Sequence, residues 1–161
     1  MTFLSVDNNL NVIKEMRRTK RQFDLPLDIH YGEAINILHS VAPNELAHAF
    51  LDFCCHVYTA TNEIKTVMEN DLVKVNGTIA ITFSKSVRNR AKNQYGDLWK
   101  TFYDVISNQD LDDRCLSDKA NILYLASLLN QRYTIRQILN YSGGDDDKGA
   151  PMTLAILQRI R

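Results

Sequence analysis

Glycine is scarce in this sequence, and the motifs that depend on it are missing. The 161 residues include six glycines, with no Gly-x-Gly-x-x-Gly run, no phosphate-binding P-loop and no Gly-x-Ser-x-Gly elbow. Such motifs need glycine because the backbone turns sharply and approaches the ligand closely. We therefore predict that the protein is not an enzyme and has no catalytic residues, no cofactor and no small-molecule substrate.

Cysteines are few, and long apolar runs are absent. The three cysteines form no disulfide framework, because their number is odd and no Cys-x-x-Cys spacing occurs. No apolar run reaches the length of about eighteen residues that spans a membrane, and the first residues do not resemble a basic leader followed by an apolar segment. The sequence predicts a protein of a reducing compartment, cytoplasmic or otherwise intracellular, with no membrane partner.

Neither sign of charge is in excess, but the two signs are separated along the chain. Nineteen basic and nineteen acidic residues cancel. Six acidic residues and one basic residue lie between Glu33 and Asp71, whereas five basic residues and one acidic residue lie between Lys85 and Lys100. Segregation of this kind is typical of surfaces that dock complementary partners or copies of the same chain.

Residues 72–83 carry the clearest local signal. Asn76 and Gly77 stand between two runs rich in β-branched residues. A type I′ turn favours Asn-Gly because both of its central residues need positive φ. The pattern predicts one β-hairpin at 72–83. Its expected buried face consists of Leu72, Ile79, Ile81 and Phe83.

The rest of the chain has the apolar spacing of helices. The longest candidate starts at Pro43, with either one long helix or two helices divided near Thr59 and Thr61 as alternatives. Its apolar stripe is Leu46, Phe50, Phe53, Val57, Ile64 and Met68. We predict a mainly α fold, a compact multi-helix domain of about seven helices with the one hairpin. The whole chain, 1–161, is expected to be a single helical domain, in which a flexible loop at 143–150 precedes a C-terminal helix at 151–161.

Three residues suggest either a metal site or a plain polar surface. His48, Asp52 and His56 are spaced four residues apart, which on a helix can align their side chains for a metal ion. They fall opposite the apolar stripe, together with Glu45 and Glu63, so a solvated polar face is the simpler interpretation. No metal site is predicted.

Residues 117–141 have the layout of a helix-turn-helix. Ser117 is a suitable N-cap for a first helix, Asn130 to Arg132 suit a short turn, and a second helix would begin at Tyr133. Arg can hold guanine, Gln and Asn can hold adenine, and Lys or Arg can bind phosphate. The predicted nucleic-acid contacts are Lys85, Arg88, Arg90, Lys92, Lys119, Arg132, Thr134, Arg136, Gln137 and Asn140. Simple packing of an antiparallel helix pair is the alternative.

These patterns predict a small non-enzymatic regulatory protein that acts in transcription as a homodimer and binds duplex DNA through residues 117–141. The alternative is a protein–protein interaction or assembly module, such as a viral, phage or plasmid factor. Such a module would bind a protein partner or itself through its segregated acidic and basic faces.

Overall fold

The computed structural model describes residues 3–53, 55–84, 101–102, 104–105, 113–142 and 151–161. Contacts between residues divide the chain into two compact units, residues 1–42 and residues 43–161. Each unit has a sheet of its own.

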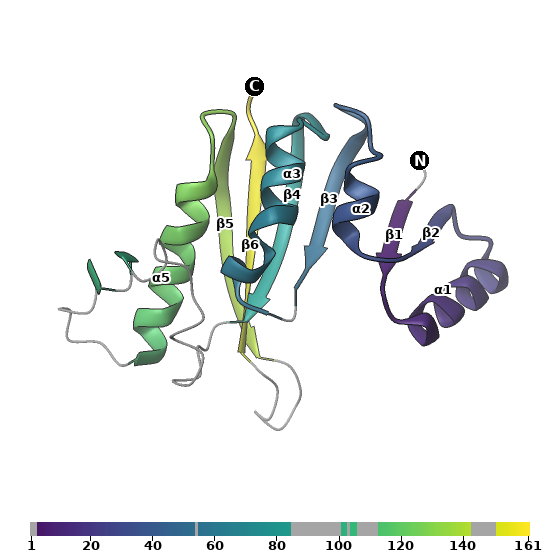
Figure 1. Ribbon diagram of the computed structural model, residues 1–161, viewed down its shortest axis with the longest axis horizontal. Helices are drawn as coiled ribbons and strands as arrows, with labels where there is room; N and C mark the ends of the chain where they lie inside the picture. Colours follow the sequence, from purple (N-terminus) through teal and green to yellow (C-terminus); the bar gives the residue numbers. More distant parts are fainter. Residues whose placement is uncertain (1–2, 54, 85–100, 103, 106–112, 143–150) are drawn as a thin grey trace. The chain divides into compact units, whose positions relative to one another are not determined.

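The first unit is built on two parallel strands. Strand β1 (Phe3–Asp7) pairs with β2 (Leu27–Tyr31), so that Asp7 lies opposite Tyr31 at the carboxyl end of the pair. Helix α1 (Leu10–Phe23) connects the two strands, and the short helix α2 (Ala34–Leu38) follows β2 (Figure 1). A parallel pair requires such a crossover connection, and a helix commonly supplies it.

The bounds of α1 follow from local hydrogen bonds. The side chain of Asn9 accepts from the backbone N–H of Asn11 at 3.0 Å and caps the first turn. At the other end Asp24 adopts the left-handed conformation with φ of 48°, and the N–H of Leu25 returns to Lys20 O at 3.1 Å. This is the usual way in which a helix ends on a left-handed residue.

The second unit contains a four-stranded mixed sheet. Its strands are β3 (Leu46–Asp52), β4 (Val73–Ser84), β5 (Tyr133–Ser142) and β6 (Pro151–Arg159), in the spatial order β3-β4-β6-β5. β3 and β4 are parallel, whereas β6 is antiparallel to both β4 and β5. A 3-10 helix η1 (Val57–Ala60), helix α3 (Thr61–Glu69) and helix α5 (Asp113–Leu128) complete the described elements of this unit.

The core of the second unit lies between one face of the sheet and its helices. Figure 1 shows α3 and α5 on the same side of the four strands. Apolar side chains from both layers are fully buried there, among them Ile64, Val67, Met68, Ile79, Ile81, Phe83, Leu125, Ala155 and Leu157. The opposite face is more open, and Phe50 on β3 is 65% exposed.

The predicted mainly α fold of about seven helices is wrong. The described residues form six strands and four α-helices, in a mixed α/β arrangement. The apolar stripe drawn from Leu46 to Met68 is spread over strand β3, the 3-10 helix η1 and helix α3, because Asp52 ends the strand well before Thr61 begins helix α3. A helical wheel that extends from a strand into a helix groups residues that do not lie on one face.

The hairpin prediction at 72–83 is also wrong. β4 runs without interruption through Asn76, which has a φ of 67°. The register with β3 shifts at this point, since Leu46 lies opposite Val73 but His48 lies opposite Thr78. The Asn-Gly pair therefore forms a bulge in one strand. The burial predicted for Leu72, Ile79, Ile81 and Phe83 is confirmed.

Gly77 is required by the close approach of the neighbouring strand. A Cβ at this position would lie 2.6 Å from Val73 Cγ1 and 2.8 Å from Lys74 O, and it would also meet Ala47 O on β3. Contacts this short are not tolerated. A glycine inside a strand commonly marks a bulge or a place where another backbone comes close.

The predicted helix-turn-helix at 117–141 does not form. Its first half is helical, as α5, but its second half is strand β5. A bulge explains the misleading spacing: Ile135 lies opposite Leu157 and Gln137 lies opposite the next residue, so Arg136 is the extra residue. One inserted residue converts the alternation of a strand into spacing that resembles a helical turn.

The predicted C-terminal helix at 151–161 is strand β6, at the centre of the sheet between β4 and β5. Its buried residues alternate as Thr153, Ala155, Leu157 and Arg159. The residues that alternate with them include the apolar Met152, Leu154 and Ile156, so the sequence has an apolar run in which the alternation is hidden. The expected flexible loop at 143–150 lies outside the described residues.

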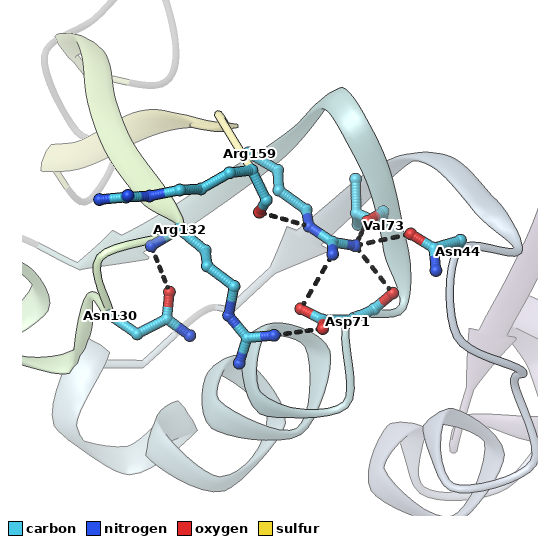
Figure 2. A network of polar contacts seen from close by, with 7 residues as sticks. Asn44, Asp71, Val73, Asn130, Arg132 and Arg159 are labelled. Carbon is cyan, nitrogen blue, oxygen red and sulfur yellow. Dashed lines mark hydrogen bonds and ion pairs between the residues drawn. The ribbon is translucent and has the colours of Figure 1, made fainter.

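A network around Arg159 closes the end of the sheet where β4 begins (Figure 2). The Arg159 side chain is 7% exposed and lies 3.3 Å from Asp71 Oδ1. Its Nη1 donates to Asn44 Oδ1 at 2.8 Å, to Val73 O at 2.6 Å and to Asp71 O at 3.2 Å. Arg132 pairs with the second oxygen of the same carboxylate. Asp71 thus neutralises two guanidinium groups, one of them buried.

In the part of the chain that the structure describes, no helix is both long enough and apolar enough to cross a membrane.

We predict that Gly77→Ala destabilises the second unit by roughly 2 kcal/mol, because the added methyl group overpacks the β3–β4 contact. Urea unfolding followed by circular dichroism measures the change. Lys74→Ala, at an exposed position of the same strand, should shift the free energy of unfolding by less than about 0.5 kcal/mol. Equal effects of the two substitutions would contradict the role given to Gly77.

We predict that Asp71→Asn destabilises the protein by roughly 3 kcal/mol, since it removes the anion beside the buried Arg159. Asn also tolerates the left-handed conformation, so the φ of 55° at this position is not the cause. The same unfolding measurement applies, with Glu15→Gln as control. Glu15 pairs with Arg18 at 3.7 Å on an exposed helix surface, where such pairs contribute little.

Candidate functional site

The carboxyl ends of the parallel strands form the candidate ligand-binding edges of both units. In open α/β sheets, ligands bind outside the carboxyl ends of the strands. β1 and β2 end at Asp7 and Tyr31 in the first unit. In the second unit β3 ends at Asp52 and β4 at Ser84, at a common edge because the two strands are parallel.

In the first unit, the end of β1 presents a partly buried carboxylate. Asp7 Oδ1 accepts from the backbone N–H of Asn9 at 2.6 Å, and Asp7 O accepts from Gly32 N at 3.1 Å. Nearby, Asn8 Nδ2 donates to Glu33 Oε1 at 3.1 Å. Gly32 has a φ of 145°, and a Cβ there would meet no heavy atom within 4 Å. The edge therefore combines a fixed carboxylate with open space beside it.

In the second unit, the end of β3 presents an oriented and exposed carboxylate. The hydroxyl of Thr82, on β4, donates to Asp52 Oδ1. The same oxygen of Thr82 accepts from the backbone N–H of Phe53 at 3.2 Å. Because Thr82 is only 3% exposed, its rotamer is fixed by packing, and Asp52 is held at the strand end.

The segment after β3 is attached to the end of β4. Ser84 N donates to Cys55 O at 2.9 Å, and the fully buried Asn121 of α5 donates through Nδ2 to Ser84 O at 3.5 Å. The His56 ring is half-buried beside this attachment. Burial lowers the pKa of His56, and a hydrogen bond with the backbone of Ser84 opposes that change.

Two tyrosines pack behind this segment. The rings of Tyr58 and Tyr124 meet edge to face, with centroids 6.0 Å apart and an angle of 75°. Thr61 Oγ1 donates to Tyr58 O at 2.6 Å, so at the 2.7 Å contact between the two hydroxyls the Tyr124 hydroxyl is the donor. These bonds tie η1 and α3 to α5.

Comparison with solved structures identifies the architecture. A SAM-dependent methyltransferase from Methanosarcina mazei matches 98% of this chain and 81% of its own, with 12% identity and a TM-score of 0.58. An SAH-bound methyltransferase from Podospora anserina matches 98% of this chain and 60% of its own, with 15% identity and a TM-score of 0.56. An N-methyltransferase from Bradyrhizobium japonicum matches 99% of this chain and 74% of its own, with 10% identity and a TM-score of 0.56.

The fold is a Rossmann-like methyltransferase fold. No protein-family model matches the sequence, and no curated protein matches it.

These matches correct the functional predictions. The prediction of a non-enzymatic, all-α DNA-binding regulator of transcription is wrong, because the matching structures named above are enzymes. In addition, the segment expected to be the DNA-recognition helix is strand β5. The expectation of no small-molecule substrate is contradicted as well, since one matching methyltransferase is bound to SAH.

The predicted nucleic-acid contacts do not form one surface on a helix. Lys85, Arg88, Arg90 and Lys92 lie outside the described residues. Lys119 is exposed on α5, and Arg132 belongs to the Asp71 network. The remaining four lie on β5, where Arg136 Nε donates to Gln158 Oε1 at 2.6 Å and Asn140 Oδ1 accepts from Thr153 at 3.1 Å.

The spacing of His48, Asp52 and His56 has a different meaning in the structure. His48 and Asp52 lie on strand β3, and His48 Nδ1 is 2.9 Å from Thr78 Oγ1. His56 precedes η1 and is not on the strand. The three residues do not share a helical face, so the geometry that suggested a metal site does not exist.

Sequence reasoning missed Asp7 and Asp52 as residues at strand ends and His56 as the residue that precedes η1. The sequence pattern assigns Asp52 and His56 to a solvated helix face instead. A usable signal is present, because each aspartate directly follows a short, mainly apolar segment of strand length. In α/β folds, an acidic residue at that place is often a ligand contact.

The lowered pKa of His56 makes stability depend on pH. Between the unfolded value, about 6.5, and the lower folded value, the unfolded chain binds more protons, so stability falls as pH falls through that window and is constant above it. We predict that the wild type loses more stability than His56→Gln between about pH 7.5 and about pH 5. Urea unfolding at both pH values tests this, with exposed His39→Gln as control; equal losses in all three proteins would contradict it.

Proposed function

We propose that this chain is a methyltransferase domain that uses S-adenosylmethionine (SAM). The observation that carries the proposal is a fixed carboxylate at the carboxyl end of β1 in a Rossmann-like methyltransferase fold. In related nucleotide-binding folds an acidic residue near a strand end binds the ribose hydroxyls. SAM supplies a methyl group on a positively charged sulfur, which a nucleophile can displace.

The residues at the β1 edge suit the ribose of this cofactor. A ribose offers two neighbouring hydroxyl donors, and an ionised carboxylate is an acceptor with two oxygens. The Asn9 N–H holds the Asp7 carboxylate. A Cβ added at Gly32 would meet no heavy atom within 4 Å, so there is open space at this edge. This sequence differs from the usual dinucleotide-binding folds because it has no Gly-x-Gly-x-x-Gly turn.

The second unit has a strand-end carboxylate of its own, that of Asp52 at the end of β3. Thr82 orients the Asp52 carboxylate, and Ser84 holds the following backbone through Cys55 O. Preorganised polar groups at a strand edge are the usual means of positioning a reacting group.

We predict that the wild type binds S-adenosylhomocysteine (SAH), the product of methyl transfer, and that Asp7→Asn weakens binding at least about tenfold, because a charge-assisted hydrogen bond becomes a neutral one. Isothermal titration calorimetry measures both affinities. Asp28→Asn is the matched control, since Asp28 is exposed on β2 and faces His30 at 3.0 Å.

Two results would count against this proposal. The first is a wild type that does not bind SAH at millimolar concentration. The second is an Asp7→Asn variant with the affinity of the wild type, which would leave the fold assignment intact but remove Asp7 from the cofactor site.

A further inference from the structure

One face of helix α1, in the first unit, carries a row of cations. All five basic residues of this unit lie on α1, which contains a single acidic residue, Glu15. Four of the five recur at the spacing i, i+3, i+4 and i+7, which places them on one face of the helix. These four exposed residues form what we call the basic stripe: Lys14, Arg17, Arg18 and Arg21.

The protein itself makes little use of the basic stripe. Three of its four cations have no hydrogen-bond or ion-pair partner among the described residues. The exception, Arg18, lies 3.7 Å from Glu15, and the two side chains are 71% and 69% exposed. An ion pair as exposed as this contributes little and exchanges its partners easily. The fifth cation, Lys20, is different, because its Nζ donates to Leu27 O at the start of β2.

The stability of the helix does not explain the basic stripe. Like charges three or four residues apart on a helix repel one another, and the stripe contains four such pairs. Cations are favourable near a helix C-terminus, but this effect is confined to about the last turn. The last turn of α1 includes Arg21 but neither Lys14 nor Arg17. The stripe is therefore unfavourable for the helix alone, and an anionic partner would relieve the repulsion.

We propose that the basic stripe binds the phosphate backbone of single-stranded RNA. A helix rises about 1.5 Å per residue, so the stripe from Lys14 to Arg21 extends about 10 Å. A nucleic-acid strand carries its negative charges at regular intervals, one on each phosphate, and arginine binds phosphate through two parallel hydrogen bonds. The stripe can thus hold successive phosphates of one strand.

Two features of α1 favour a single strand over other polyanions. The apolar side of the helix packs on β1 and β2, where Ile13 is fully buried, so this side is not available for insertion into a membrane. Phe23, beyond the stripe at the end of the helix, is 62% exposed. The unstacked bases of single-stranded RNA stack on such rings. A duplex keeps its bases stacked inside, and an acidic peptide has none.

The test is fluorescence anisotropy with a labelled oligouridine of about 12 nucleotides, which is within the range of single-strand binding sites. Each phosphate neutralised on a single strand contributes a salt slope of about −0.7, so four contacts predict binding that weakens roughly 50-fold between about 50 mM and about 200 mM salt. Arg17→Gln/Arg21→Gln should lower the affinity at the lower salt concentration at least about tenfold and halve the salt slope. Arg17→Lys/Arg21→Lys should keep most of the affinity, because it keeps the charge.

The matched control is Lys65→Gln/Lys74→Gln, which removes the same charge from exposed positions of the second unit and should leave the affinity unchanged. Phe23→Leu should weaken the binding of oligouridine roughly fivefold but not that of inorganic polyphosphate, which has no bases. In thermal unfolding, Arg17→Gln/Arg21→Gln should be at least as stable as the wild type, because repulsion within the stripe is relieved. Its loss of affinity is then not a loss of fold.

Three results with oligouridine would overturn the inference: undiminished binding in Arg17→Gln/Arg21→Gln, an equal loss in the control, or no binding by the wild type at about 50 mM salt, where sequence-independent affinity is large. Equal or tighter binding of polyglutamate or of phosphatidylserine vesicles would also overturn it, because the stripe would then suit a protein or a membrane. The affinity for SAH is a separate readout and should be unchanged in Arg17→Gln/Arg21→Gln. Its absence in the wild type would remove the proposed function and leave the basic stripe as it is.

Discussion

The buried guanidinium of Arg159 holds one end of the four-stranded sheet in register. A buried cation is tolerated only when it is paired and its N–H groups have acceptors. Arg159 meets this condition through the carboxylate of Asp71 and through the oxygens of Asn44, Val73 and Arg161. These acceptors come from the segment before β3, the start of β4 and the end of β6. A slip of β6 by one residue would move the guanidinium to the other face of the sheet, so the ion pair specifies the register.

This arrangement separates the stabilising end of the sheet from the end that carries candidate chemistry. Because β3 and β4 are parallel, the Asp71 network lies at their amino ends, and Asp52 and Ser84 lie at their carboxyl ends. The network satisfies its buried charges internally. At the other end Asp52 remains exposed, and its only described hydrogen-bond partner is Thr82. A group that binds a ligand needs donors or acceptors that the protein itself does not use. At the carboxyl end of β3, Asp52 has such acceptors.

The failure to predict the fold has two local causes that can be located. Sequence patterns assume an uninterrupted period, and both β4 and β5 contain bulges. Gly77 is needed because a Cβ at this position would meet Ala47 O on β3, which is distant in sequence. No local pattern therefore distinguishes this glycine from a glycine in a turn. At Arg136 the extra residue changes the apparent period of β5. The buried face of β4 was predictable because alternation resumes beyond the bulge.

The candidate site was harder to predict because the assignment and direction of the strands decide which residues lie at a carboxyl edge. The sequence spacing sets Asp52 and His56 beside His48 as a possible metal set, and a helical wheel gives all three one solvated face. In the structure they differ in environment: burial lowers the pKa of His56, whereas Asp52 is exposed at the strand end. Burial of the same kind would raise the pKa of a carboxylate and cost it its charge. The helical wheel gave the two residues one environment, whereas the end of β3 and the backbone that precedes η1 give them two.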